Sequence, residues 1–162
     1  MSPDFQHFKE QINNPFKFRL FMLQRLPSAL FAGLRIKAFD EQHSIVTVKY
    51  TWFNQNPFRS MYFAIQCMAA EMSTGLLASG QVHQRNPAVS MLVIGLEAKF
   101  MKKAVDTVSF TCMQGNVIRE TVDAAIAAGE SKVITCQSTG TNMAGEIVSE
   151  FRITWSFKVK KS

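Results

Sequence analysis

The hydrophobic residues at the start of the chain recur at helical spacing. Phe16, Leu20 and Leu23 lie three or four residues apart, directly behind a proline that suits the first turn of a helix. A second proline at position 27 interrupts this pattern, and Gly33 ends it. We therefore expect residues 1–32 to form an N-terminal segment of short helices.

After Gly33 the hydrophobic spacing changes to two residues, which is typical of a strand. Leu34, Ile36 and Ala38 alternate with their neighbours, a polar turn follows, and residues 44–53 are rich in β-branched and aromatic side chains. These two segments predict a hairpin. Four further strands are predicted, at residues 89–101, 106–113, 131–139 and 147–159.

The segment 60–79 is rich in Ala, Met and Leu, which favour a helix. It is apolar nearly all round and carries a single charged residue, Glu71, so we expect it to be buried on most sides with a sheet wrapped around it. Residues 117–128 predict a second, amphipathic helix that ends at Gly129 and lies outside the sheet.

Together these segments predict an α+β domain with an antiparallel sheet of about six strands around a central helix. Consecutive strands after a single helix favour antiparallel pairing over parallel βαβ units. The chain has 162 residues, of which 47% are hydrophobic and 19% charged. This length fits one domain, spanning 1–162, with residues 1–32 packed on it. The proportion of hydrophobic to charged residues excludes a disordered or fibrous protein.

A basic surplus adds a first indication of function. The chain contains 18 Lys and Arg but 12 Asp and Glu, for a net charge of +6. An anionic partner would fit this surplus, but charge alone favours a surface that merely keeps the protein soluble. Lys17, Arg19 and Arg25 make the N-terminal segment basic, either as a solvated face or as a binding patch. Nucleic-acid binding would rest on charge alone, so we do not expect it.

The three cysteines, Cys67, Cys112 and Cys136, are far apart and form no CxxC pair. We expect buried free thiols in a reducing compartment and no metal site. The first residues show no signal-peptide pattern, and no apolar run is long enough to span a membrane. These features predict a cytoplasmic protein without a membrane span.

Glu71 is the most informative residue for chemistry. Burying an unpaired carboxylate costs several kcal/mol, so such a group is paired, protonated or functional. The turn 54–60 leads into the same helix, whose first backbone N–H groups could hold an anion or a developing oxyanion. The alternative is that Glu71 accepts structural hydrogen bonds at a dimer interface.

The order of these elements resembles the hotdog fold of acyl-CoA thioesterases and dehydratases. The helix between strands four and five and the lead-in LPSALFAGLRI are similar to a subgroup described as a domain of unknown function, DUF4442. The resemblance covers nearly the whole chain. It implies a homodimer or a tetramer in which subunits extend one sheet and share their sites.

The resemblance also suggests which residues would act. Phenylacetyl-CoA-type thioesterases carry an Asn-x5-His-Gly-Gly motif with an acidic residue nine positions after the His. Asn56 and Glu71 match the Asn and the acid, Tyr62 and Phe63 stand at the His and the first Gly, and Ser90 is the nearest match to a supporting hydroxyl. With Tyr62 in the place of the catalytic His, dehydration is not expected.

The reaction implied is hydrolysis of an acyl thioester by carboxylate-assisted attack of water. Coenzyme A would enter as part of the substrate, with no separate cofactor, and Lys102 and Lys103 could bind its phosphates. The Phe63 side chain would crowd the thioester carbonyl, where the family has Gly. The alternative is therefore a non-catalytic protein that binds acyl-CoA or a fatty acyl chain.

Overall fold

A computed structural model describes residues 3–160 of the chain. The N-terminal segment forms three short helices, α1 (Pro3–Asn13), α2 (Pro15–Arg25) and α3 (Pro27–Phe31). The side chain of Asn14 caps α2 by accepting hydrogen bonds from the backbone amides of Phe16 and Lys17 at 3.1 Å. The expected helical segment is confirmed for the part that the structure describes, and residues 1–2 lie outside it.

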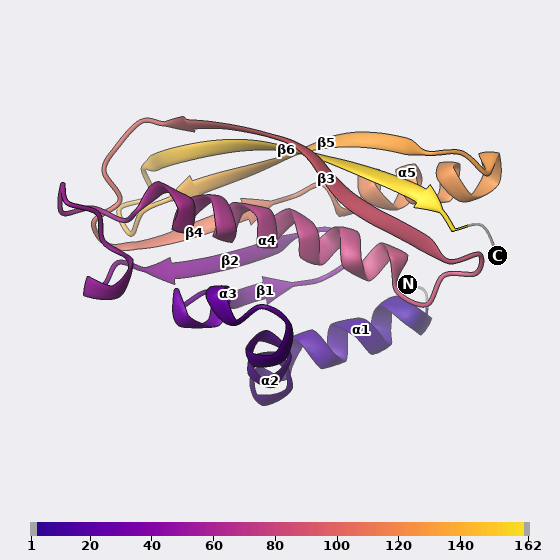
Figure 1. The fold of residues 1–162 in the computed structure, drawn as a ribbon, viewed down its shortest axis with the longest axis horizontal. Coiled ribbons are helices and arrows are strands. Elements are labelled where there is room, and N and C mark those ends of the chain that lie inside the picture. Colours follow the sequence, from indigo (N-terminus) through magenta and orange to yellow (C-terminus); the bar gives the residue numbers. More distant parts are fainter. Residues whose placement is uncertain (1–2, 161–162) are drawn as a thin grey trace.

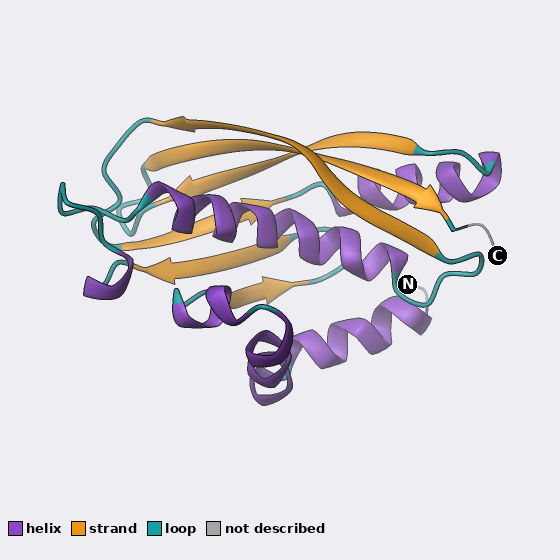
Figure 2. Cartoon of the chain, in the orientation of Figure 1, coloured by secondary structure: helices purple, strands orange, loops and turns teal. Residues whose placement is uncertain are grey.

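Six strands form one antiparallel sheet, as predicted (Figures 1 and 2). Its spatial order is β1-β2-β4-β5-β6-β3, so β1 and β3 are the two edge strands. The strands are β1 (Arg35–Phe39), β2 (Ser44–Lys49), β3 (Val89–Phe100), β4 (Thr107–Cys112), β5 (Lys132–Thr141) and β6 (Ile147–Val159).

The predicted strand at 44–53 is too long, because β2 ends at Lys49 and residues 52–54 form a 3₁₀ helix. Asn54 fixes this turn: its side-chain amide donates to the carbonyl oxygens of Lys49 and Ala32, and its side-chain oxygen accepts from the Thr51 amide. These bonds satisfy backbone groups that a continued strand would have placed in the sheet ladder.

The central helix α4 (Phe63–Val82) runs along one face of the sheet (Figure 1). Ala69, Ala70 and Leu77 are fully buried, which confirms that the sheet wraps this helix. Two polar side chains tie it to the strands. Ser73 shares a 2.8 Å hydrogen bond with the Ser138 hydroxyl, and Gln66 accepts one of 2.9 Å from Ser149.

Helix α5 (Gly115–Ala128) does not lie outside the sheet as expected. It packs against α4 as well as against β5 and β6, and Arg85, just after α4, forms a 2.7 Å ion pair with Asp123 of α5. Its apolar stripe of Ile118, Val122 and Ala125 is fully buried on the helical side of the sheet. An amphipathic pattern shows that one face is buried but not which layer buries it.

The N-terminal helices pack on α4 and on the β1 edge of the sheet. Phe5 of α1 stacks on Phe39 of β1 and lies so close to Gly80 of α4 that a β-carbon there would come within 2.5 Å of its ring. The absence of a side chain at Gly80 therefore allows α1 to approach α4. Among the described residues, no helix is long and apolar enough to cross a membrane.

Candidate functional site

Two separate hollows lie along α4, one at its middle and one at its N-terminal end. The middle cavity has a volume of about 200 Å³ and contains Glu71. Its other walls come from the N-terminal helices, α4 and the edge of the sheet. These lining residues are Phe8, Gln11, Ile12, Phe18, Phe21, Leu26, Met72, Gly75, Leu76, Ser79, Met91 and Trp155.

Of the described residues that line this cavity, Glu71 alone is ionisable, and its carboxylate has no ion pair or side-chain hydrogen bond with any of the residues described. Burial raises the pKa of this carboxyl above 4.5, because few polar groups replace the water that the charged form loses. The carboxyl group is nevertheless not sealed off, since it faces an open cavity. It can therefore meet a small molecule that enters there.

A chain of two hydrogen bonds links Trp155, Thr74 and the backbone of Glu71. The indole N–H of Trp155 donates a 3.0 Å hydrogen bond to the Thr74 hydroxyl, which in turn donates to the backbone carbonyl of Glu71 at 3.0 Å. A β-carbon at Gly75 would lie 3.1 Å from Glu71 Oε1 and 3.3 Å from the Trp155 ring. The small residue thus leaves room for both groups.

The second hollow is an open groove of about 430 Å³ at the N-terminal end of α4. It holds five of the predicted site residues, Asn56, Tyr62, Phe63, Lys102 and Lys103, together with one that was not predicted, Gln66. The residues that line it are Asn56, Pro57, Phe58, Ser60, Met61, Tyr62, Phe63, Gln66, Phe100, Met101, Lys102, Lys103 and Ala104.

Asn56 lines this groove, but its side chain is occupied by the turn that precedes α4. Its side-chain oxygen accepts from the amides of Phe58 and Ser60 at 2.9 and 3.2 Å, and its amide nitrogen donates to the Ser60 hydroxyl at 3.1 Å. Asn56 therefore shapes the entry to the helix. Within one chain it does not share a cavity with Glu71.

Tyr62 caps α4 without a side-chain hydrogen bond, and its own amide donates to the Asn54 carbonyl at 2.8 Å. The next two amides, of Phe63 and Ala64, have no hydrogen-bond partner among the residues that the structure describes. The Phe63 ring packs edge-on against Phe100 and Tyr62 at centroid distances of 6.2 and 5.0 Å. Free backbone donors thus border an aromatic wall of the groove.

Lys102 and Lys103 line the same groove but differ in their partners. The Lys102 ammonium is paired with Glu146, and this hydrogen bond holds the pKa of Glu146 below its usual value. Lys103 donates to the backbone carbonyl of Phe58 at 3.3 Å and has no carboxylate partner among the residues described. Lys103 is therefore the more available cation for a phosphate.

Ser90 stands apart from both hollows. Its hydroxyl donates a 3.0 Å hydrogen bond to the carbonyl of Lys158, and the neighbouring Met91 lines the Glu71 cavity. Because adjacent strand residues face opposite sides of a sheet, Ser90 points away from Glu71 in the same chain. Among the described residues there is also no cluster of His, Cys, Asp and Glu that could hold a metal ion.

Two site residues escaped the sequence analysis. Trp155 lies on β6, and strand periodicity alone would have placed it on the buried face with Ile153 and Phe157. Gln66 is a buried amide on an otherwise apolar stretch of α4, visible in the sequence as a polar exception. The contribution of α1 and α2 to the Glu71 cavity had no sequence signal, because it depends on how distant segments pack.

This architecture defines a class of protein. It is similar to a Pseudomonas aeruginosa protein of unknown function named "Probable Thioesterase", with a TM-score of 0.76 and 17% identity over 90% of this chain and 97% of that one. The chain is also similar to a Haemophilus influenzae thioesterase, with a TM-score of 0.64 and 12% identity over 89% of this chain and 90% of that one. A third similar structure is the Escherichia coli PaaI protein from the phenylacetic acid degradation operon. Its TM-score is 0.63, with 15% identity over 91% of this chain and 94% of that one.

The shared architecture is the hotdog fold, an antiparallel sheet wrapped around one central helix. The chain belongs to the DUF4442 family, a domain of unknown function whose profile matches residues 16–157. Among curated proteins, none matches the chain in sequence. The sequence-based assignments of fold and family are both confirmed.

Proposed function

We propose that this protein hydrolyses an acyl-CoA-like thioester. The observation that carries the proposal is Glu71, an unpaired carboxylate with a raised pKa in an otherwise apolar cavity. Such a cavity suits an acyl chain, and a carboxylate whose pKa is raised toward neutrality is a better general base. The fold shared with proteins named as thioesterases supports the same chemistry.

In the proposed reaction, Glu71 accepts a proton from a water molecule whose oxygen attacks the thioester carbon. The carbonyl oxygen becomes an oxyanion that accepts hydrogen bonds from the free amides of Phe63 and Ala64. Collapse of this intermediate breaks the carbon–sulfur bond and releases the thiol and a carboxylic acid. Asn56 would act by holding the turn that aims these amides, with Ser90 or Thr74 in support.

A single chain does not bring these groups together. Nine residues separate Tyr62 from Glu71 on α4, which at 1.5 Å per residue is about 13 Å along the helix axis. A homodimer would solve this problem if Glu71 of one copy faced the start of α4 in the other. The same symmetry could bring Ser90 toward a site from which it is separated within its own chain.

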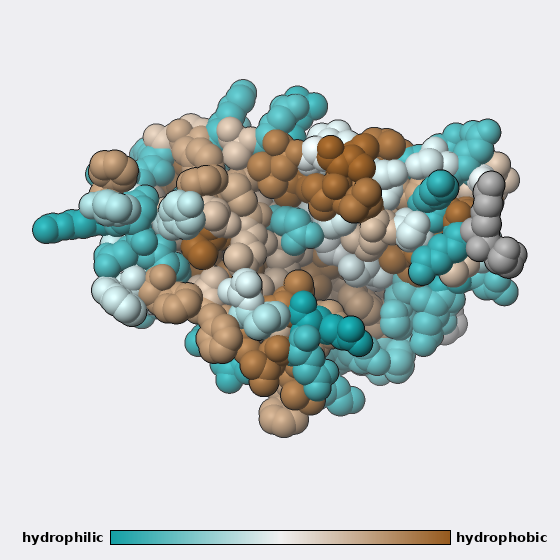
Figure 3. All heavy atoms as spheres, viewed as in Figure 1, coloured by the Kyte–Doolittle hydropathy of each residue, from teal (hydrophilic) through white to brown (hydrophobic). Residues whose placement is uncertain are grey.

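The β3 edge is the surface we assign to this dimer. It is a 12-residue strand at the end of the sheet, and its outward side chains Leu92, Ile94 and Leu96 are 65%, 53% and 45% exposed. Figure 3 shows a hydrophobic region over this strand. A long apolar edge strand invites pairing with a second strand, which would extend the sheet across two copies.

The phosphates of coenzyme A would lie near Lys103, with Lys102 beside it. Because both lysines lie in the groove that holds the free amides, one thioester could place its phosphates there and its carbonyl near the helix start. Coenzyme A is thus part of the substrate, and no further cofactor is needed. The three free cysteines fit the reducing cytoplasm expected from the sequence.

One observation favours the alternative, a binding protein without turnover. Phe63 and Phe100 pack edge-on at the groove, close to the amides that would hold the oxyanion. If this aromatic wall blocks the thioester carbonyl from those amides, the protein would bind an acyl chain in the Glu71 cavity and release it unchanged.

The two functions are separated by measuring binding and turnover on the same ligands. Acyl-CoAs from acetyl to palmitoyl would be assayed for release of free thiol, and binding would be followed by tryptophan fluorescence. A Trp52→Phe background leaves Trp155, which lines the Glu71 cavity, as the remaining indole. Thiol release supports the thioesterase, and saturable quenching without release supports the binding protein.

A further inference from the structure

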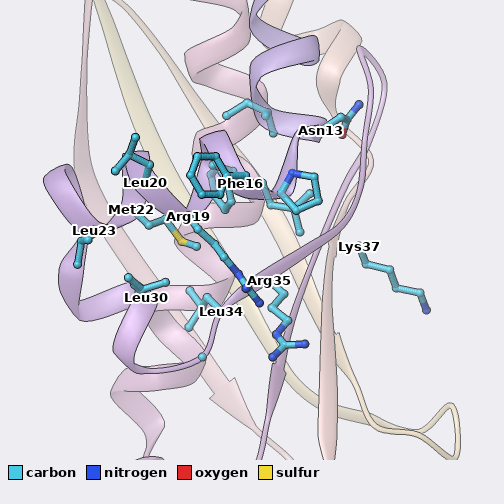
Figure 4. Close-up of a pocket in the computed structure, with 15 residues that line it drawn as sticks. Asn13, Phe16, Arg19, Leu20, Met22, Leu23, Leu30, Leu34, Arg35 and Lys37 are labelled. Carbon is cyan, nitrogen blue, oxygen red and sulfur yellow. The ribbon is translucent and has the colours of Figure 1, made fainter.

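A third hollow lies between the N-terminal helices and β1, and it shares Ile12 and Phe18 with the lining of the Glu71 cavity. This groove has a volume of about 850 Å³ (Figure 4). Its floor and walls are mostly apolar, and the ionisable residues that line it in the described part of the chain are Arg19, Arg35 and Lys37. Figure 4 shows both arginine side chains in the groove and Lys37 extending away at its rim.

The helix above this groove is apolar on the side that faces water. Helix α2 buries Phe18 and Met22 against the protein, yet Phe16, Leu20 and Leu23 are 77%, 47% and 51% exposed. Their spacing of four and three residues places these three side chains in one exposed stripe, which also lines the groove. Exposed Phe21, Leu26 and Phe31 extend this apolar surface along α2 and α3.

The charge around this stripe has one sign. Residues 11–39 contain five basic residues and no acidic one: Lys17, Arg19, Arg25, Arg35 and Lys37. All five are exposed, and none forms an ion pair or side-chain hydrogen bond with a residue that the structure describes. The rest of the chain holds 13 basic and 12 acidic residues, so this segment accounts for five of the six surplus charges.

We propose that the α2–α3 surface docks on an anionic lipid bilayer. An exposed apolar stripe flanked by unpaired cations is the pattern of a helix that lies in a membrane interface, with its apolar side chains below the headgroups and its cations among the phosphates. The groove beside it offers Arg19 and Arg35 to a lipid headgroup. Figure 3 shows hydrophobic and hydrophilic side chains adjoining over α2.

Two other partners could be considered for this surface, a second copy of the chain and a nucleic acid, and its charge and apolar side chains argue against both. A second copy docked through the same face would set five cations against five, which is unfavourable in a symmetric interface. A nucleic acid would satisfy the cations, but it would leave the outward leucines and phenylalanines without an apolar partner. An anionic lipid surface satisfies both features, because it offers phosphates to the cations and acyl chains to the apolar side chains.

Flotation of the full chain with lipid vesicles tests this proposal directly. The protein would float with phosphatidylcholine vesicles that contain phosphatidylglycerol and much less with phosphatidylcholine alone, and added salt would weaken the binding. Arg19→Glu/Arg35→Glu should weaken the partition at least tenfold, since each cation near an anionic membrane contributes about fivefold. Phe16→Ser/Leu23→Ser should weaken it comparably by removing the inserted side chains.

The matched control is Lys158→Glu/Lys160→Glu, which changes the net charge equally at exposed positions at the C-terminal end of β6. It should bind vesicles like the wild type, and circular dichroism should show every variant folded. The proposal would be overturned if the control lost as much vesicle binding as the variants of the α2–α3 surface. It would also be overturned if the wild type bound neutral vesicles equally well or bound no vesicles. A third contrary result would be that the variants of the α2–α3 surface change the oligomeric mass or RNA binding but float with vesicles like the wild type. None of these results depends on thioester hydrolysis.

Discussion

Glu71 and Gly75 lie one helical turn apart on α4, and the carboxylate of Glu71 occupies the space that a side chain at Gly75 would need. A β-carbon at Gly75 would come within 3.1 Å of Glu71 Oε1, with the Trp155 ring 3.3 Å away on the other side. The position of the carboxylate therefore depends on a residue that makes no polar contact with it.

Gly75→Ala should lower activity without unfolding the protein. Alanine is favoured over glycine inside a helix by about 1 kcal/mol, which offsets the tight contact, while the displaced carboxylate should lower kcat/KM by roughly tenfold. Gly95→Ala is the matched control, because its new β-carbon would meet Thr154 at an ordinary 3.5 Å, and its oligomeric mass is measured as well since it lies on the β3 edge. Thermal unfolding and thiol release measure the two effects, and an unchanged kcat/KM would show that the carboxylate position is unimportant.

Glu71→Gln should stabilise the protein at high pH. Burial raises the pKa of Glu71 in the folded state above 4.5, so the folded chain holds this proton more tightly than the unfolded chain. The wild type therefore loses stability as pH rises from about 4.5 through the raised pKa, and the glutamine variant does not. The difference in Tm should be small at pH near 4 and favour the variant at pH near 8. Glu120→Gln, at an exposed position on α5, is the matched control for the loss of one carboxylate.

Lys103→Glu should weaken the binding of coenzyme A thioesters in particular. An exposed ion pair contributes about 0.2–1 kcal/mol and reversal turns attraction into repulsion, so KM should rise roughly threefold to tenfold. An acyl-pantetheine, which lacks the nucleotide phosphates, should be hydrolysed with an unchanged KM. Lys158→Glu controls for net charge. Equal effects on both substrates would place the nucleotide elsewhere.

The cysteines should differ in reactivity by position. Burial raises the pKa of Cys112 to about 11 and that of Cys136 to about 12, whereas Cys67 is only partly buried. Ellman's reagent should therefore label no more than Cys67 in the folded protein and all three thiols in guanidinium. Cys67→Ser should abolish the native-state labelling. Rapid labelling of two or three thiols would contradict the packing around β4 and β5.

The sequence was most informative where the signal is local. The range predicted for β6, residues 147–159, matches the structure, because a long alternating run between turns has one regular form. Helix α4 begins at Phe63 and not at Ser60, since the Asn56 side chain holds the preceding residues in a turn. That Asn-Pro turn chemistry was present in the sequence and could have set the boundary.

The candidate site was predictable in part. The sequence singled out Glu71, which does line a cavity, and Asn56, Tyr62, Phe63, Lys102 and Lys103 do share one groove. The division into two hollows could not be predicted, because the Glu71 cavity is closed by Phe8 and Phe18 from another part of the chain. The number of residues between two positions on a helix gives their distance along its axis. Which distant segments cover each position depends on tertiary packing.

The most direct test of the proposed function compares acyl-CoA hydrolysis by the wild type and by Glu71→Gln. The wild type should release free thiol, and the variant should lose about a hundredfold to ten-thousandfold in kcat, the usual contribution of a general base. Substrate should still quench Trp155 fluorescence in the variant, which separates lost chemistry from lost binding. Full thiol release by Glu71→Gln would contradict the role of Glu71 as the base.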